Sequence, residues 1–116
     1  MKKIYRVKKS TEIENIIKNK KSSGNKYFNV YKKESFETQN FRYAISVGKK
    51  IGNAVRRNRV KRQLRAIIAE ISIINQNLDV FVVAKPTVND IDFVEMKKQL
   101  VYLFKKINIE IKGERN

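Results

Sequence analysis

The sequence predicts an α+β domain, a single α/β sandwich in which a central mixed sheet packs against helices, in the order α-β-β-α-β-α. Three observations predict this fold. Residues 26–32 and 41–47 alternate apolar and polar side chains, as half-buried strands do, and residues 78–84 form a nearly continuous apolar run. Segments with apolar residues at helical spacing flank them. The 116 residues, without internal repeat or linker, are expected to form one domain.

The N-terminal part is expected to be a basic arm followed by a short helix. Residues 1–9 are basic, and a helix to about residue 20 follows, with Thr11 and Glu14 at the spacing of a capping box. Its apolar stripe consists of Ile13, Ile16 and Ile17. Packing against the sheet is the expected role of Ile16.

The first two strands are expected to form a hairpin. Residues 22–25 are typical of a turn, residues 26–32 form the first strand, and residues 34–40 connect it to the second. Phe28 and Val30 share one face, and Tyr31 lies on the other. The second strand places small or charged side chains on that other face, namely Arg42, Ala44 and Ser46. The small ones are expected beside Tyr31, where they would leave a trough.

A basic segment dominates the charge of the chain. Residues 49–65 hold eight Lys or Arg and no carboxylate, and residues 38–69 contain no Asp or Glu. Gly52 and Asn53 are expected to open a helix there, with Asn53 as its cap. An apolar stripe faces the core, namely Val60, Leu64, Ile67, Ile68 and Ile71. The opposite face carries Asn58, Arg59, Lys61, Arg62 and Arg65.

The start of this helix predicts an anion site. Arg56, Arg57 and Arg59 lie in the first two turns, where the helix dipole disfavours cations by about 0.3 to 1 kcal/mol each. A bound anion would reverse that penalty, and free N–H groups with guanidinium groups suit phosphate. A net charge of +16 likewise indicates a polyanionic partner.

The C-terminal part predicts a buried strand and a last helix. The basic helix is expected to end near residues 75–77, and residues 78–84, which follow it, suit a buried central strand. Asp92 and Glu95 offer a second capping pair. The core stripe of the last helix is Phe93, Met96, Leu100, Leu103, Phe104 and Ile107.

Catalysis by the chain itself is not expected. It has no histidine, the commonest general base, and its carboxylates are scattered or explained by capping, so neither a catalytic residue nor a metal site is predicted. There is no cysteine, no apolar run approaches the roughly 18 residues of a membrane span, and Lys8 and Lys9 interrupt any signal-peptide core. We expect a cytoplasmic protein without membrane contact.

The run AVRRNRVKRQLR, preceded by SVGKKIGN, resembles the Arg-Asn-Arg signature of the bacterial ribonuclease P protein component. The positions that agree are Ala54, Arg57, Asn58, Arg59, Lys61, Arg62 and Arg65. The resemblance implies a four-stranded sheet related to the second domain of ribosomal protein S5. It also implies a left-handed β-α-β crossover through the basic helix, where general rules favour a right-handed one.

The resemblance implies a protein subunit of the endonuclease that removes 5′ leaders from precursor tRNA. Its partners would be ribonuclease P RNA and precursor tRNA, with no protein partner required. The RNA subunit and its Mg²⁺ would perform the cleavage, and the protein itself would bind no cofactor. Residues expected to hold the catalytic RNA are Lys49, Lys50, Arg56, Arg57, Asn58, Arg59, Lys61, Arg62 and Arg65. Residues expected to border the leader are Ile13, Ile17, Tyr31 and Ser46, where isoleucine replaces the aromatic residues usual at the first two positions.

The sequence leaves two other classes of nucleic-acid-binding protein open. A ribosomal protein or RNA chaperone could use the same basic surface without any processing activity. A DNA-binding helix-turn-helix module is disfavoured because a strand follows the basic helix where a further helix would be expected.

Overall fold

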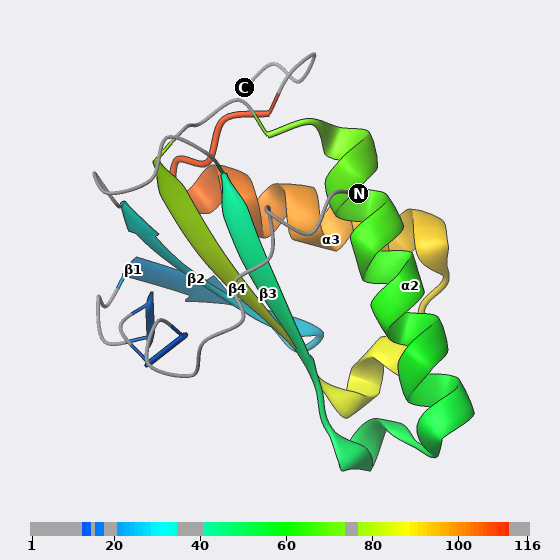
Figure 1. Cartoon of the computed structure of the whole chain (residues 1–116). Helices are drawn as coiled ribbons and strands as arrows, with labels where there is room; N and C mark the ends of the chain where they lie inside the picture. Colours follow the sequence, from blue (N-terminus) through cyan, green and yellow to red (C-terminus); the bar gives the residue numbers. More distant parts are fainter. Residues whose placement is uncertain (1–12, 15, 18–20, 35–40, 74–76, 112–116) are drawn as a thin grey trace.

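The computed structural model centres on a four-stranded mixed sheet (Figure 1). The residues that it describes are 13–14, 16–17, 21–34, 41–73 and 77–111. In spatial order the strands are β1 (Lys21–Gly24), β2 (Phe28–Glu34), β4 (Leu78–Ala84) and β3 (Arg42–Val47). The first two pairs are antiparallel and β3 runs parallel to β4, so the predicted mixed sheet is confirmed.

The central position of β4 explains its composition. It pairs with β2 on one side and with β3 on the other, and six of its seven residues are buried. Val80 and Val82 are fully buried beneath the helices, while Phe81 is buried on the opposite face. The prediction of a buried central strand from the apolar run is confirmed.

The edge strand β1 is not among the strands predicted from the sequence. Ser22 and Gly24 lie within it rather than in a turn, and the turn follows at Asn25, whose Oδ1 accepts from the backbone N–H groups of Tyr27 and Phe28. The hydroxyl of Ser23 donates to the carbonyl of Leu103. A short polar edge strand has too weak an alternation to be separated from a turn. The four strands implied by the family resemblance are confirmed.

The expected hairpin between the second and third strands is wrong, because β4 lies between β2 and β3. Its expected connection falls largely on residues 35–40, which lie outside the described residues. As the family resemblance implies, the chain passes from β3 through a helix to β4, its parallel neighbour, as a β-α-β unit. The left-handed sense of this crossover stays a prediction.

The helix in that unit is α2 (Ala54–Ile71), which packs with α3 (Phe93–Lys106) on one face of the sheet (Figure 1). Its buried residues are the five predicted, Val60, Leu64, Ile67, Ile68 and Ile71. It ends earlier than expected, since Ser72 adopts a left-handed conformation and Ile73 pairs with Ile111 in a β-bridge. A strand follows α2, which contradicts a helix-turn-helix arrangement.

The last helix, α3 (Phe93–Lys106), follows the predicted pattern closely. Asp92 caps it by accepting a hydrogen bond from the backbone N–H of Glu95, at 2.9 Å. The stripe is buried at Met96, Leu100, Leu103 and Phe104, while Phe93 is half-buried and Ile107 is buried just beyond the helix end. Together α2 and α3 close the main core over one sheet face.

Candidate nucleic-acid interface

The basic helix begins at a tight backbone junction. A short 3₁₀ turn, η2 (Lys49–Ile51), leads to Gly52, whose φ of 152° is rarely adopted by residues with a side chain. A Cβ at this position would also lie 3.0 Å from the Cγ of Arg56. Asn53 then caps the helix, its Oδ1 accepting from the backbone N–H of Arg56 at 3.0 Å. The predicted cap is confirmed.

The nine residues predicted to bind catalytic RNA all lie on α2 and the turn before it, and those on the face of α2 opposite the core are Asn58, Arg59, Lys61, Arg62 and Arg65. Exposed side chains are those of Lys49, Lys50, Arg56, Asn58, Arg59 and Arg62, and half-buried ones are those of Arg57, Lys61 and Arg65. Within the described part of the chain, no carboxylate forms an ion pair with any of these side chains. The cationic groups are therefore available to an external anion.

A shallow groove of about 480 Å³ runs along this face of α2. It is lined by Val55, Asn58, Arg62 and Arg65, which recur at intervals of three or four residues. Val55 is 76% exposed although it is apolar, and it lies among groups that bind phosphate. Such a strip offers guanidinium groups for phosphates and an apolar surface for a sugar between them.

Arg57 is less exposed than Arg56 and Arg59, the other arginines in the first two turns of α2. Its Nε is buried and has no hydrogen-bond partner among the residues that the structure describes. The side chain is half-buried, so it packs along the protein and does not extend freely into solvent. A guanidinium held in this way loses less conformational freedom when it binds an anion.

The charge distribution of α2 opposes its own dipole. Its first turn contains no acidic residue, and Arg56 and Arg57 lie there instead; its last turn contains no basic residue. Cations near a helix N-terminus are unfavourable by roughly 0.3 to 1 kcal/mol each. An anion bound beside these residues would relieve that cost and meet the helix N-terminus, as the sequence predicted.

The second face of the sheet carries a smaller cluster built around Phe81. Buried Ile16, Ala44 and Phe81 form its centre, and Ile13 and Tyr31 pack against them. The rings of Tyr31 and Phe81 are stacked, with centroids 6.2 Å apart. The expectation that Ile16 packs on the sheet is confirmed, since its side chain is fully buried.

The prediction that small side chains of β3 lie directly beside Tyr31 and leave a trough there is wrong. Ala44 and Ser46 lie on β3, which is separated from β2 by β4, so Phe81 stands between Tyr31 and Ala44. Phe81 was overlooked because an apolar run does not reveal which of its residues face away from the helices. The alternation within β4, once its neighbours are known, places Phe81 on this face.

The four residues predicted to border the leader lie on or beside this face to different extents. Ile13 and Tyr31 belong to the same cluster, and Ile17 is 41% exposed, one residue beyond buried Ile16. Ser46 is half-buried and pairs in register with Val83, which also packs against the cluster. The face thus presents an aromatic ring, aliphatic surface and a hydroxyl.

Two buried charged groups of the sheet lie away from α2. Arg42 holds Asp79 through two hydrogen bonds, from Nε to Oδ1 at 2.9 Å and from Nη2 to Oδ2 at 2.8 Å. Lys32 is also buried, and this burial lowers its pKa, opposed by the nearby charge of Glu34. The fold therefore compensates charge inside the sheet, whereas the cations of α2 face outward.

The described residues hold no group of three metal-ligating side chains. Among them no helix combines the length and apolar character that crossing a membrane requires. The side chains of η2 and α2 supply hydrogen-bond donors, cations and apolar surface, which suit an RNA partner.

Comparison with known proteins identifies the family. The model of the ribonuclease P family matches residues 1–108. The ribonuclease P protein component of Pediococcus pentosaceus is 42% identical over 106 residues, 90% of this chain and 89% of the relative. That of Bacillus cereus is 40% identical over 107 residues, 91% of this chain and 93% of the relative.

Solved structures agree with this match. The ribonuclease P protein of Staphylococcus aureus has a TM-score of 0.81 at 33% identity, over 90% of this chain and 96% of that chain. The Thermotoga maritima protein has a TM-score of 0.74 at 27% identity, over 87% of this chain and 96% of that chain. By both sequence and fold, the chain belongs to the ribonuclease P protein family and acts as an RNA-binding subunit of that ribonucleoprotein.

Proposed function

We propose that the outward face of η2 and α2 binds phosphates of ribonuclease P RNA. The residues assigned to it are Lys49, Lys50, Arg56, Arg57, Asn58, Arg59, Lys61, Arg62 and Arg65. One observation carries the assignment: within the described structure these cations have no carboxylate partner, while the opposite face of the same helix is fully occupied by the core. A helix that needed only solubility would use mixed charges at i,i+4 spacing.

The second face of the sheet is proposed to bind the 5′ leader of precursor tRNA. Ile13, Ile17, Tyr31 and Ser46 would border it, and the ring of Phe81 on the neighbouring strand stacks against that of Tyr31. Tyr31 can stack on a base, an interaction of about 1 to 3 kcal/mol. The isoleucines can contact a sugar or base edge but cannot stack. Leader recognition would therefore depend on one aromatic ring.

Chain connectivity supports joint use of the two surfaces. The edge strand β3 carries Ser46 on the second face and continues through Gly48 into Lys49 and Lys50, directly before α2 (Figure 1). The exposed lysines of η2 thus adjoin the strand that borders the proposed leader face. They would screen repulsion where a precursor tRNA meets the RNA subunit.

The cleavage chemistry is assigned to the RNA subunit and its Mg²⁺. The complete absence of histidine and the scattered carboxylates support a protein that supplies no general acid or base. Its contribution would be substrate affinity and charge screening. We further propose a single domain that acts in the cytoplasm and needs no protein partner.

Reconstitution tests this function. The protein would be combined with the ribonuclease P RNA of Bacillus cereus, whose protein component is 40% identical, and with a precursor tRNA at low Mg²⁺. Addition of the protein is expected to restore 5′ processing, with no cleavage by the protein alone. Cleavage without RNA, or no gain in processing with it, would contradict the proposal.

Leader binding has its own test. Tyr31→Ala should weaken the affinity of the reconstituted enzyme for precursor tRNA by about tenfold, through lost stacking, without changing its affinity for mature tRNA. Tyr102→Ala, which removes a 57% exposed tyrosine from α3, is the matched control and should have no effect. Equal losses for both RNAs would exclude a leader contact at Tyr31.

A further inference from the structure

The second face of the sheet, which carries Tyr31, is accessible along one row of residues. In β4, six residues are buried and Val83 is half-buried. Val83 pairs in register with Ser46 of β3 and with Asn29 of β2, and Asn29 pairs with Gly24 of β1. Paired residues of neighbouring strands point to the same face. These four residues therefore form one row, the cross-strand row, which spans all four strands over about 14 Å.

The neighbouring rows are closed where they cross β4. Phe81 and Ala44 of the next row are buried in the cluster with Ile16. In the row after it, Asp79 is buried and bound by Arg42 through two hydrogen bonds. A strand of RNA on this face would therefore contact the centre of the sheet at the cross-strand row.

Asn29 is the residue of this row with the largest hydrogen-bonding capacity. Its side chain is half-buried, and its carboxamide makes no hydrogen bond within the described structure. Because alternate residues of a strand share a face, Asn29 lies beside Tyr31, about 7 Å along β2. An amide that can both donate and accept, beside an aromatic ring, suits a nucleobase better than a phosphate, since a phosphate only accepts.

Gly24 makes room for this carboxamide. A Cβ added at Gly24 would overlap the Oδ1 of Asn29. The backbone of Gly24 lies outside the left-handed region that favours glycine, so a side chain there would change the space above the strand and not its conformation. The position of the Asn29 amide thus depends on a glycine in the adjacent strand.

We propose that Asn29 hydrogen-bonds the edge of the leader base that stacks on Tyr31, with Gly24 leaving the space from which its carboxamide approaches that base. The proposal rests on the leader-binding function proposed for this face. It adds a contact to a base edge, which presents donors and acceptors, whereas the ring of Tyr31 can stack on any base. The leader would cross the strands from Ser46, close to the lysines of η2, toward Gly24.

Precursor tRNAs with one abasic nucleotide at successive leader positions test the proposal. The affinity of the reconstituted enzyme would be measured with the unaltered protein and with Asn29→Ala. For an intact leader, the variant should bind about two- to tenfold more weakly, the effect of one hydrogen bond. At one leader position, removal of the base should make the two proteins equal, because the hydrogen-bond partner is gone. Tyr31→Ala should lose its effect at the same position.

Two glycine variants test the role of the space above Gly24. Gly24→Ala should displace the Asn29 amide and weaken the affinity for the intact leader by about the same two- to tenfold. It should add nothing in the presence of Asn29→Ala, since both changes remove the same contact. Gly48→Ala is the matched control and should have no effect, because a Cβ added there meets no atom within 4 Å.

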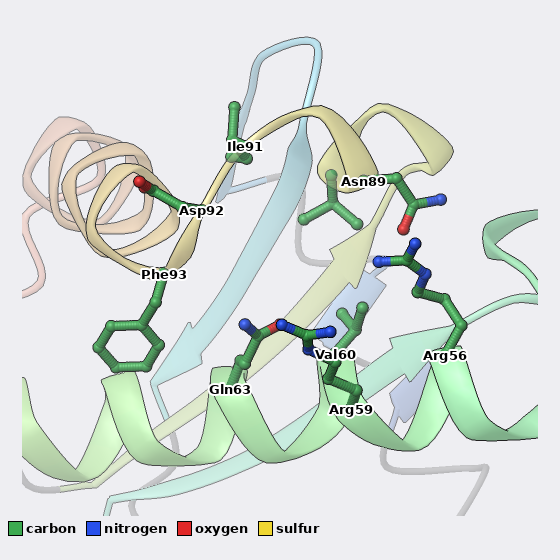
Figure 2. Close-up of a pocket in the computed structure, with 9 residues that line it drawn as sticks. Arg56, Arg59, Val60, Gln63, Asn89, Ile91, Asp92 and Phe93 are labelled. Atoms are coloured by element: carbon green, nitrogen blue, oxygen red, sulfur yellow. The ribbon is translucent and has the colours of Figure 1, made fainter.

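A further control removes an amide on the opposite side of the sheet. Gln63 of α2 is also half-buried. It lines a pocket of about 300 Å³ between α2 and the 3₁₀ helix η3 (Pro86–Asp90), together with Arg56 and Asn89 (Figure 2). Removal of the leader base should cost the same affinity in Gln63→Ala as in the unaltered protein. Affinity for mature tRNA, which has no leader, should be unchanged in Asn29→Ala and Gly24→Ala and reports correct assembly.

Three results would overturn the proposal: equal affinity of Asn29→Ala and the unaltered protein for the intact leader, a penalty for Asn29→Ala that persists at every abasic position, or a Gly24→Ala variant that binds like the unaltered protein. If Tyr31→Ala keeps its effect in these cases, the leader face stands and the role of Asn29 fails. If neither Tyr31→Ala nor Asn29→Ala changes the affinity for the leader, the function proposed for this face fails as well.

Discussion

The two long helices pack on the same face of the sheet but arrange their charges in opposite ways. The charges of helix α3 complement its dipole, with Glu95 in the first turn and Lys105 and Lys106 in the last. Helix α2 opposes its dipole, with Arg56 and Arg57 in the first turn and no basic residue in the last. The packing stripes of the two helices are equally well buried, so the contrast concerns their solvent faces alone.

The helices also differ in how their charges are compensated. On α3, Gln99 donates to Glu95 at 2.7 Å, and Lys97 bridges to Glu70 of α2 at 2.6 Å. In the described structure the cations of the α2 interface have no such partners. The charges of α3 are compensated within the fold, whereas the cations of the α2 interface stay available for the polyanion that we propose as their partner.

The largest expected effect is that of salt on RNA binding. If about six to eight phosphates are neutralised, raising salt from 50 to 200 mM should weaken binding to ribonuclease P RNA by roughly 10³ to 10⁵. A filter-binding or fluorescence titration at several salt concentrations measures the slope. A nearly flat dependence would remove the electrostatic distinction between the helices.

Charge reversal on each helix should give the next largest effect. Arg59→Glu on α2 should weaken RNA binding about ten- to a hundredfold, the value of one charge-assisted contact of about 1.5 to 3 kcal/mol. Lys98→Glu on α3 changes the charge equally at another exposed position and should do much less. Circular dichroism should show both variants folded; an unfolded Arg59→Glu would indicate a structural role for Arg59.

Sulfate should stabilise the free protein, because an anion near the start of α2 relieves its dipole and the repulsion within a chain of net charge +16. For one site with a dissociation constant on the order of 10 mM, 50 mM sulfate would add about 1 kcal/mol. Thermal unfolding against potassium chloride of equal ionic strength checks this. Identical melting temperatures in the two salts would argue against a preformed anion site.

The smallest expected effect is a change in the free energy of unfolding, and for Arg56→Glu the gain in stability accompanies a loss of RNA affinity. Arg56→Glu should raise the free energy of unfolding by about 0.3 to 1 kcal/mol, because it places an acid at the start of α2, while RNA binding weakens. Glu95→Arg at the matching position of α3 should lower stability by a similar amount. Denaturant titrations of both variants measure the pair. The same sign of change in both would show that the dipole argument fails.

Local pattern predicted the helices well. Spacings of three and four residues identified the buried stripe of α2, and Asn53 and Asp92 act as the caps that their positions suggested. These features depend on residues close in sequence, which is why a single sequence reveals them. The exposure of most basic side chains of α2 could be predicted for the same reason, since they lie opposite that stripe.

Features that depend on distant residues could not be predicted in this way. Alternation reveals the faces of a strand but not its neighbours, so β4 was not expected between β2 and β3. Phe81 consequently went unnoticed beside Tyr31. The pocket brings Arg56 of α2 together with Asn89 of η3, and no local spacing links residues so far apart.

The central claim is that the outward face of α2 contacts the RNA subunit. Because the chain has no cysteine, a photo-crosslinker can be attached at one introduced thiol, through Val55→Cys in the groove of α2 or Tyr102→Cys on α3. The account predicts efficient crosslinking to ribonuclease P RNA from position 55 and little from position 102 in the assembled enzyme. Equal crosslinking from both positions, or stronger crosslinking from position 102, would contradict it.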